Sequence, residues 1–307
     1  MEPGRGAAVK SARLGLGCLA LGGSYGPVDS TCAVRLIHQA LDAGVVLLDA
    51  AGDTAGGMVQ RIVGQAVAGR RDEVAIAAHS RLSGAEGMAP TTPAKACEQI
   101  LRRIDVDYFD LFYLHLGGSR MPVEETIGTA AALVEAGKVG ALGISGISPE
   151  QLLRAHTIHP LASLAVEYSL LERGAERELL PLARRLGLIV AAGRPLARGL
   201  LTGRIASCAE LGPADARMAD PRFATDRLAS VRELLAELEA TAARLNLGAA
   251  RLALAWLLSR GEEVLPLPGT SDQVHLEMNL SARRIELSEE VAETLTALFE
   301  PVREPGE

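Results

Sequence analysis

The chain has very little lysine. It carries 31 basic side chains among 307 residues, and only Lys10, Lys95 and Lys138 are lysines. Aromatic residues make up 3% of the sequence. The four cysteines, Cys18, Cys32, Cys97 and Cys208, form no CxxC pair. Few positions can therefore supply a catalytic ammonium group, and the cysteine spacing excludes the usual zinc and dithiol redox motifs.

Long apolar runs and targeting signals are also missing. No apolar run reaches about 18 residues, the length typical of a membrane span, and no charged start leads into an apolar stretch. The net charge of −7 argues against a nucleic-acid partner. We expect a cytoplasmic protein without a membrane partner that acts on a small molecule. A homo-oligomer is compatible with the sequence.

Short apolar runs alternate with amphipathic stretches along the whole chain. This alternation predicts a strand followed by a helix, eight times over. The expected strands are 14–19, 45–48, 74–78, 109–114, 139–144, 163–167, 188–192 and 264–267. Eight such units indicate an α/β fold of the (β/α)₈ TIM-barrel type, with residues 1–307 as one domain. A doubly wound sheet is the rival, but the phosphate-binding glycine turn typical of that fold is missing after the first strand.

Helix boundaries carry the expected chemistry. Ser30, Thr92, Pro122 and Ser148 stand at helix starts, where hydroxyl caps and proline are favoured. Gly44, Gly137 and Gly187 stand at helix ends, where a left-handed residue is favoured. The polar, proline-containing stretch 209–226 is predicted to be a long loop. The helical pattern of 228–258, with Trp256, predicts core or subunit contact.

Barrel chemistry is expected at the carboxyl ends of the strands. Asp49, His79 and His115 fall at the ends of the second, third and fourth strands. An aspartate beside a histidine is an acid/base device, because the carboxylate orients the ring and stabilises its positive charge. Arg194, after the seventh strand, is a candidate for binding a substrate anion or an enolate, or for a salt bridge with Glu167 or Asp49. Tyr25, in the first loop, is a candidate phenol, with packing as the other interpretation.

Several blocks in order resemble the aldo-keto reductases. They are residues 14–18, 48–57, 107–115, 135–145, 167–170, 195–203 and 265–270. The resemblance implies the barrel fold and an NADPH-dependent reduction of a carbonyl, using an Asp, a Tyr, a Lys and a His. Asp49 and His115 match two of these positions. Thr54 stands where the family has the proton-donating Tyr, and His79 stands where it has the Lys.

The positions that the resemblance assigns to the cofactor are changed as well. Gly193 and Arg194 replace the Tyr and Ser that precede the pyrophosphate loop. Gly146, Ala165, Ser271, Asp272 and Met278 replace other contact residues. Ser145, Arg198, Gly199 and Asn279 are retained as weak, vestigial cofactor contacts. We therefore expect no bound cofactor.

These changes lead to a first hypothesis of a lyase- or isomerase-type enzyme on a reductase scaffold. Asp49 and His79 would form the acid/base pair, His115 would assist, Arg194 would bind substrate and Tyr25 would offer a phenol. The reaction would be a dehydration, isomerisation or cyclisation of a small oxygenated or secondary metabolite, with no metal. An Asp/His/His metal site is a weaker interpretation. The alternatives are an NADP- or NAD-dependent reductase with an atypical proton relay, and a non-catalytic binding or regulatory relative.

Overall fold

Eight parallel strands form a closed barrel. The computed structural model describes residues 12–51, 56–82, 91–119, 121–205 and 207–300. The strands are β1 (Leu16–Gly17), β2 (Leu47–Asp49), β3 (Ala75–Arg81), β4 (Phe109–His115), β5 (Val139–Ser145), β6 (Leu161–Glu167), β7 (Ile189–Gly193) and β8 (Val264–Pro266). Each pairs with the next in chain order, and a parallel bridge between Gly17 and Gly269 joins the two edges. The predicted barrel and its eight strands are confirmed.

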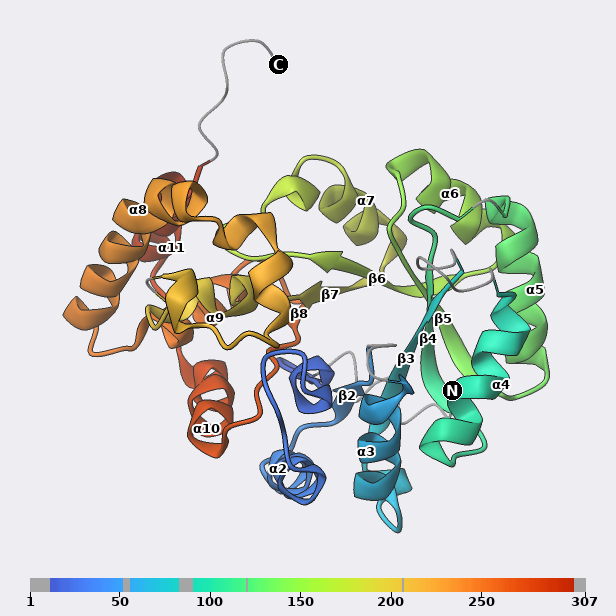
Figure 1. Cartoon of the computed structure of the whole chain (residues 1–307). Helices are drawn as coiled ribbons and strands as arrows, with labels where there is room; N and C mark the ends of the chain where they lie inside the picture. The colour runs from blue at the N-terminus through green and yellow to red at the C-terminus, as the bar shows by residue number, and fades with distance from the viewer. Residues whose placement is uncertain (1–11, 52–55, 83–90, 120, 206, 301–307) are drawn as a thin grey trace.

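Helices surround the strands. They are α2 (Ser30–Asp42), α3 (Met58–Val67), α4 (Pro93–Ile104), α5 (Val123–Glu135), α6 (Pro149–Ile158), α7 (Leu179–Leu186), α8 (Thr225–Arg244), α9 (Ala249–Leu258), α10 (Gln273–Ser281) and α11 (Glu289–Leu298). Figure 1 shows them outside the strands, from α2 at the bottom through α5 at the right to α8 at the left. Each helix therefore carries the chain back to the end of the barrel at which the next parallel strand begins.

The helix starts follow the cap residues with one exception. Thr92 and Ser148 accept hydrogen bonds from the third residue of α4 and α6, as predicted. In α2 the cap is Asp29, whose carboxylate accepts from the Cys32 amide, and Ser30 is already helical. An aspartate caps as well as a serine does, so the residue type alone could not choose between these neighbours.

The stretch 209–226 is more structured than predicted. It contains the short 3₁₀ helices η6 (Cys208–Glu210), η7 (Ala216–Ala219) and η8 (Pro221–Phe223) before α8 begins at Thr225. Asp215 and Asp220 each accept a hydrogen bond from the amide two residues later, which starts η7 and η8. This segment lies beside the mouth of the barrel and contributes to the site described below.

Apolar side chains fill two layers. The outer layer packs helices against strands and includes Trp256 of α9, which is fully buried and donates to the Thr296 hydroxyl. The core prediction for 228–258 is thereby confirmed for α9, whereas α8 buries only Leu228, Leu238, Thr241 and Ala242. The inner layer fills the barrel with small residues such as Ala77 and Ala191 around Leu111 and Tyr113. Neighbouring residues of one strand belong to different layers, as Ala77 and Ala78 of β3 do. A closed eight-stranded barrel requires this alternation of inward and outward side chains.

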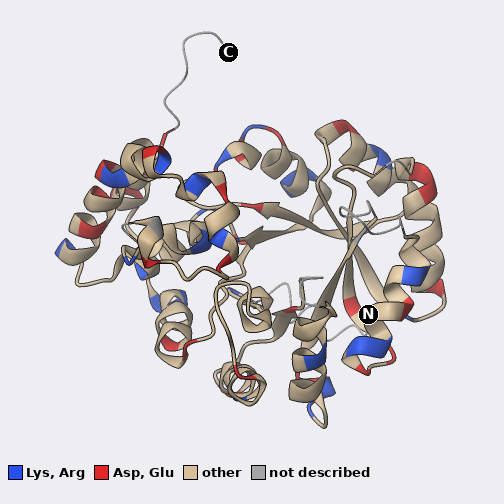
Figure 2. Cartoon of the chain, in the orientation of Figure 1, with Lys and Arg blue, Asp and Glu red and all other residues tan. Residues whose placement is uncertain are grey.

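Charged residues lie mainly on the outer helices. Figure 2 shows basic and acidic positions interspersed around the molecule. Within the described ranges, no helix combines the length and the apolar character that crossing a membrane demands.

Candidate active site

The mouth of the barrel is lined by polar residues from consecutive strands. Asp49 ends β2, His115 ends β4 and Ser145 ends β5, while His79 lies two residues before the end of β3. Glu167 ends β6 and pairs in register with Gly193 of β7. The strand order therefore collects the predicted acid/base residues at one end of the barrel, where this fold holds its chemistry.

Asp49 and His79 are in direct contact. Nε2 of His79 lies 2.7 Å from Oδ1 of Asp49, although the ring N–H does not point along this line. The same Oδ1 accepts from the Ala51 amide at 3.1 Å. The two side chains keep exposed fractions of 10% and 20%. A carboxylate at this distance can accept a hydrogen bond from Nε2 after a small rotation of the ring.

Tyr113 supports the His79 ring from below. The two rings stack with centroids 4.4 Å apart and planes 25° from parallel. The Tyr113 hydroxyl is 2.7 Å from Ser163 Oγ, and that serine donates to the Ile189 carbonyl, so the tyrosine donates to the serine. Burial, followed by the charge of Asp49, raises the pKa of Tyr113. Its phenol stays protonated and fixed, which suits a supporting residue and not a proton donor.

Glycine at position 143 makes room for this tyrosine. A Cβ on Gly143 would stand 2.4 Å from Cδ1 of Tyr113, far inside van der Waals contact. Because the tyrosine ring occupies that volume, the imidazole of His79 rests on an aromatic surface in a barrel otherwise filled by alanine and leucine. His79 is therefore positioned by β4 and β5 as well as by its own strand.

His115 is held by the next strand. Its Nδ1 lies 3.0 Å from Ser145 Oγ. Gly117 and Gly146 lie so close to the ring that a Cβ on either would approach its atoms to 2.8 and 2.7 Å. The imidazole thus has one hydroxyl partner and little freedom to turn, as expected of a group that orients a ligand.

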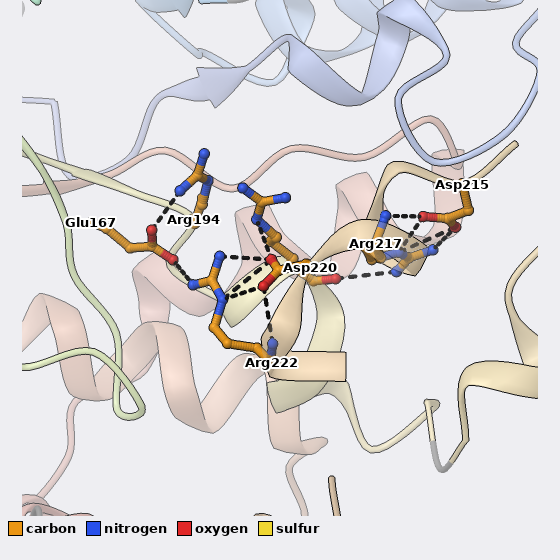
Figure 3. Close-up of polar contacts among 7 residues, drawn as sticks. Glu167, Arg194, Asp215, Arg217, Asp220 and Arg222 are labelled. Atoms are coloured by element: carbon orange, nitrogen blue, oxygen red, sulfur yellow. Dashed lines mark hydrogen bonds and ion pairs between the residues drawn. The ribbon is translucent and has the colours of Figure 1, made fainter. Parts of the chain in front are cut away.

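A second set of charged residues lies at the ends of β6 and β7. Glu167 is gripped from two sides, since Arg194 Nη1 donates to one oxygen at 2.5 Å and Arg222 donates to the other. Arg222 also donates to Asp220 at 2.8 Å, and Arg198 Nε lies 3.2 Å from the same carboxylate. Figure 3 shows Glu167 between Arg194 and Arg222, with Asp220 beside them. Of the two salt bridges predicted for Arg194, the one with Glu167 is present.

The charged groups of this cluster shift one another's pKa values. Hydrogen bonds from Arg222 hold the pKa of Asp220 below its ordinary value, and Arg217 does the same for Asp215. Burial, followed by the charge of Arg194, lowers the pKa of Arg198. The two guanidinium groups of Arg194 and Arg198 lie close together, and such a pair of cations favours an anion beside it.

Arg217 joins three segments around the cluster. It binds both oxygens of Asp215, donates to the Arg198 carbonyl at 3.1 Å and stacks on the Tyr25 ring at 4.6 Å. The Ala216 amide also donates to the Ser24 carbonyl. The predicted phenol of Tyr25 is therefore brought to the β7 side of the mouth. Burial raises its pKa although arginines nearby oppose the change.

The loop after β7 has an unusual backbone. Arg194, Ala197 and Arg198 have positive φ values of 50°, 47° and 56°, and Gly199 has 103°. A Cβ on Gly199 would meet Arg217 Nη1 at 3.1 Å. Positive φ at three non-glycine residues of one short loop is costly, and such residues concentrate at ligand sites.

The remaining predicted residues are dispersed. Asn279 is buried within α10, outside the strand ends that carry the other predicted residues. Thr54 lies outside the described residues. Among the residues that sequence reasoning missed are Asp215, Arg217, Asp220 and Arg222. Their signal was present as two Asp-x-Arg triplets five residues apart, in which the carboxylate caps a turn and binds the arginine two positions later.

Comparisons with known proteins agree on one family. The profile described as "Aldo/keto reductase family" matches residues 13–300. The chain is 34% identical over 300 residues to "Probable aldo-keto reductase 1" of Glycine max, covering 94% of this chain and 85% of that protein. It is also 34% identical over 305 residues to "Aldo-keto reductase str7" of Strobilurus tenacellus, covering 96% and 89%.

Solved structures show the same likeness. An aldo-keto reductase of Klebsiella pneumoniae in complex with NADPH superposes with a TM-score of 0.75 at 28% identity, covering 95% of this chain and 92% of that one. The glycerol dehydrogenase of Gluconobacter oxydans superposes with a TM-score of 0.82 at 29% identity, covering 93% and 90%. The barrel fold is thus shared with these proteins.

Proposed function

Because this chain belongs to the aldo/keto reductase family, we propose that it is an NAD(P)H-dependent oxidoreductase that reduces a carbonyl group. The observation that carries the proposal is the Asp49–His79 contact at the mouth of a barrel that is shared with proteins named reductases or dehydrogenases. In this proposal Thr54 and His79 stand at the positions of the family's Tyr and Lys, and a histidine takes over the proton transfer.

The expectations of no cofactor and of a lyase or isomerase are wrong. They are overturned by relatives named aldo-keto reductases along nearly the whole chain and by a similar structure solved with NADPH. The replaced contact residues had suggested that the cofactor was lost. Family membership over residues 13–300 also favours an enzyme over the non-catalytic alternative.

The residues present fit the phosphate portion of a dinucleotide. Arg198 Nε is buried without a linear hydrogen bond, beside a second guanidinium and on a loop of positive φ. Arg198 and Gly199 would hold the pyrophosphate, Ser145 the carboxamide and Asn279 the adenine end. NAD(P)H, when bound, supplies a hydride to the carbonyl carbon.

The chain's own residues handle the proton. Asp49 holds Nε2 of His79 and stabilises the positive charge on the ring, so Nδ1–H can be donated to the oxygen that gains negative charge. His115, fixed by Ser145, orients the carbonyl oxygen by hydrogen bonding. A neutral threonine hydroxyl is too weak an acid for this step, which is why the imidazole is assigned to it.

The proposal is tested by titrating NADPH and NADH against the protein while following nicotinamide fluorescence. Cofactor oxidation is then measured with a panel of aldehydes. We expect saturable binding of at least one cofactor and turnover that depends on the aldehyde. Binding without turnover of any aldehyde or ketone contradicts a reductase, and the absence of binding contradicts the proposal entirely.

A further inference from the structure

The charged cluster at the β6 and β7 ends contains one more cation than anions. Its guanidinium groups belong to Arg194, Arg198, Arg217 and Arg222, and its carboxylates belong to Glu167, Asp215 and Asp220. This local excess stands in a chain whose net charge is −7. A half-buried positive excess inside an acidic protein attracts an anion to that place.

The four arginines differ in how many donors they use. Arg217 binds both oxygens of Asp215, and Arg222 bonds to both Asp220 and Glu167. Arg194 donates only through Nη1, to Glu167, within the part of the chain that the structure describes. Its side chain keeps an exposed fraction of 36%. The Nε–H and Nη2–H₂ groups of Arg194 are therefore available to a ligand.

Arg194 is also held in place over the mouth. It follows Gly193, which pairs with Glu167 at the ends of β7 and β6. Glu167 cannot swing away, because Arg222 grips its second oxygen. In the order β1 to β8, β7 is four strands from β3, so Arg194 lies across the mouth from His79. Figure 3 shows one nitrogen of Arg194 facing Glu167 and another directed away from it.

From this arrangement we infer that Arg194 binds an oxyanion of the substrate, so that the enzyme prefers carbonyl compounds carrying a carboxylate or a phosphate. The inference rests on the proposed function, because it names the substrate class of the same site. The fork of a guanidinium binds such groups through two parallel hydrogen bonds. The carbonyl of the same molecule then faces His79 and His115 on the opposite wall, and Gly193 adds no side chain between them.

The test compares 4-oxobutanoate with its methyl ester, two aldehydes that differ in charge at the far end. The variants are R194Q and R194K, and the control is R154Q, which removes an exposed arginine of α6 paired with Glu124. We expect the wild type to favour the acid at least about tenfold in kcat/KM. R194Q should lose this preference through a higher KM for the acid, with kcat and the ester little changed. R194K should restore part of it, and R154Q should behave as the wild type.

Three results overturn the inference. They are equal use of acid and ester by the wild type, an unchanged acid preference in R194Q, and a change in R194Q confined to the dissociation constant of the cofactor. The last result would assign the guanidinium to a cofactor phosphate. If no aldehyde is reduced, the proposed function fails, and calorimetric titration with succinate decides the inference separately. Succinate should bind the wild type, and R194Q should bind it at least about tenfold more weakly.

Discussion

Asp49 and Asp110 are both buried carboxylates of barrel strands, yet their partners differ in kind. Asp110, early in β4, accepts from Arg71 Nη2 at 2.7 Å and from the Ile76 amide at 2.9 Å. Asp49, at the end of β2, faces His79 and the Ala51 amide. An arginine keeps its proton at every pH that a protein survives, whereas a histidine exchanges its proton near neutrality.

This difference suggests that the Arg71–Asp110 ion pair stabilises the fold, whereas the Asp49–His79 pair takes part in the reaction. Arg71 also donates to the Val74 and Tyr108 carbonyls, so its pair with Asp110 ties three segments together far from the mouth. The Asp49–His79 pair ties only two neighbouring strands and remains partly open to solvent. We expect removal of the first pair to destabilise the fold and removal of the second to slow the reaction.

The largest effect is expected from His79→Asn. The ring is lost as a proton donor while a polar group of similar length remains, so kcat/KM for the carbonyl should fall by about 10²- to 10⁴-fold. Steady-state kinetics of cofactor oxidation measures this, with the cofactor dissociation constant expected to stay within about twofold because His79 is not among the assigned cofactor contacts. His159→Asn, at the end of α6, is the matched control. A loss of less than fivefold in His79→Asn would assign the proton to another group.

Asp110→Asn should act on stability instead. It leaves the largely buried Arg71 guanidinium without its charged partner, which costs about 3 kcal/mol of unfolding free energy. Urea denaturation measures the loss, and kcat per folded molecule should match the wild type. The exposed neighbour Asp107→Asn is the control. If Asp110→Asn impaired kcat as strongly as His79→Asn, the distinction between the two pairs would be lost.

Asp220→Asn tests the charged cluster. Arg198 and Arg222 each lose a carboxylate, and we expect about 2 kcal/mol of destabilisation. Arginine partners lower the folded-state pKa of Asp215 and Asp220, so their contribution is complete above the unfolded-state pKa, about 3.9, and disappears as the pH falls through the lower folded values.

Thermal melts between neutral pH and about pH 3, a range chosen to cross these values, measure both effects. The melting temperature of the wild type should fall below about pH 4, and this fall should be shallower in Asp220→Asn. Glu237→Gln, which changes an exposed residue of α8, should keep the wild-type slope. A parallel acid slope in Asp220→Asn would show that other carboxylates govern acid unfolding.

Tyr113→Phe should have the smallest effect. Ser163 keeps its bond to the Ile189 carbonyl and the ring remains beneath His79, so the cost is about 1 kcal/mol. Turnover should change by less than about threefold, since the hydroxyl does not take part in the proton transfer. A loss of activity comparable with that of His79→Asn would mean that the phenol itself donates the proton.

The sequence predicted the barrel more fully than the site. The strand 109–114 is apolar except for Asp110 and is followed by His115, so the apolar run and its position located both the strand and its functional end. The contact between Asp49 and His79 followed from the same logic, because neighbouring parallel strands bring equivalent ends together.

The other side of the mouth was less predictable. Glu167 is gripped by Arg222, which is 55 residues away on a segment that had been predicted to be a loop. Long-range pairs between irregular segments leave no periodic trace. The support of His79 by Tyr113 was also missed, because stacking across strands depends on Gly143 leaving space, which no spacing rule reveals.

The tyrosine beneath His79 has a practical consequence for redesign. Its hydroxyl is bonded to Ser163 on β6, and Gly143 on β5 leaves space for its ring. The position of the His79 imidazole is therefore set by strands of the barrel. Substitutions on the rim that leave these contacts with β5 and β6 intact can then change which molecules enter without changing the position of the proton donor. The residues that would select the substrate are thus separate from those that position the proton donor, which is a favourable starting point for directed evolution.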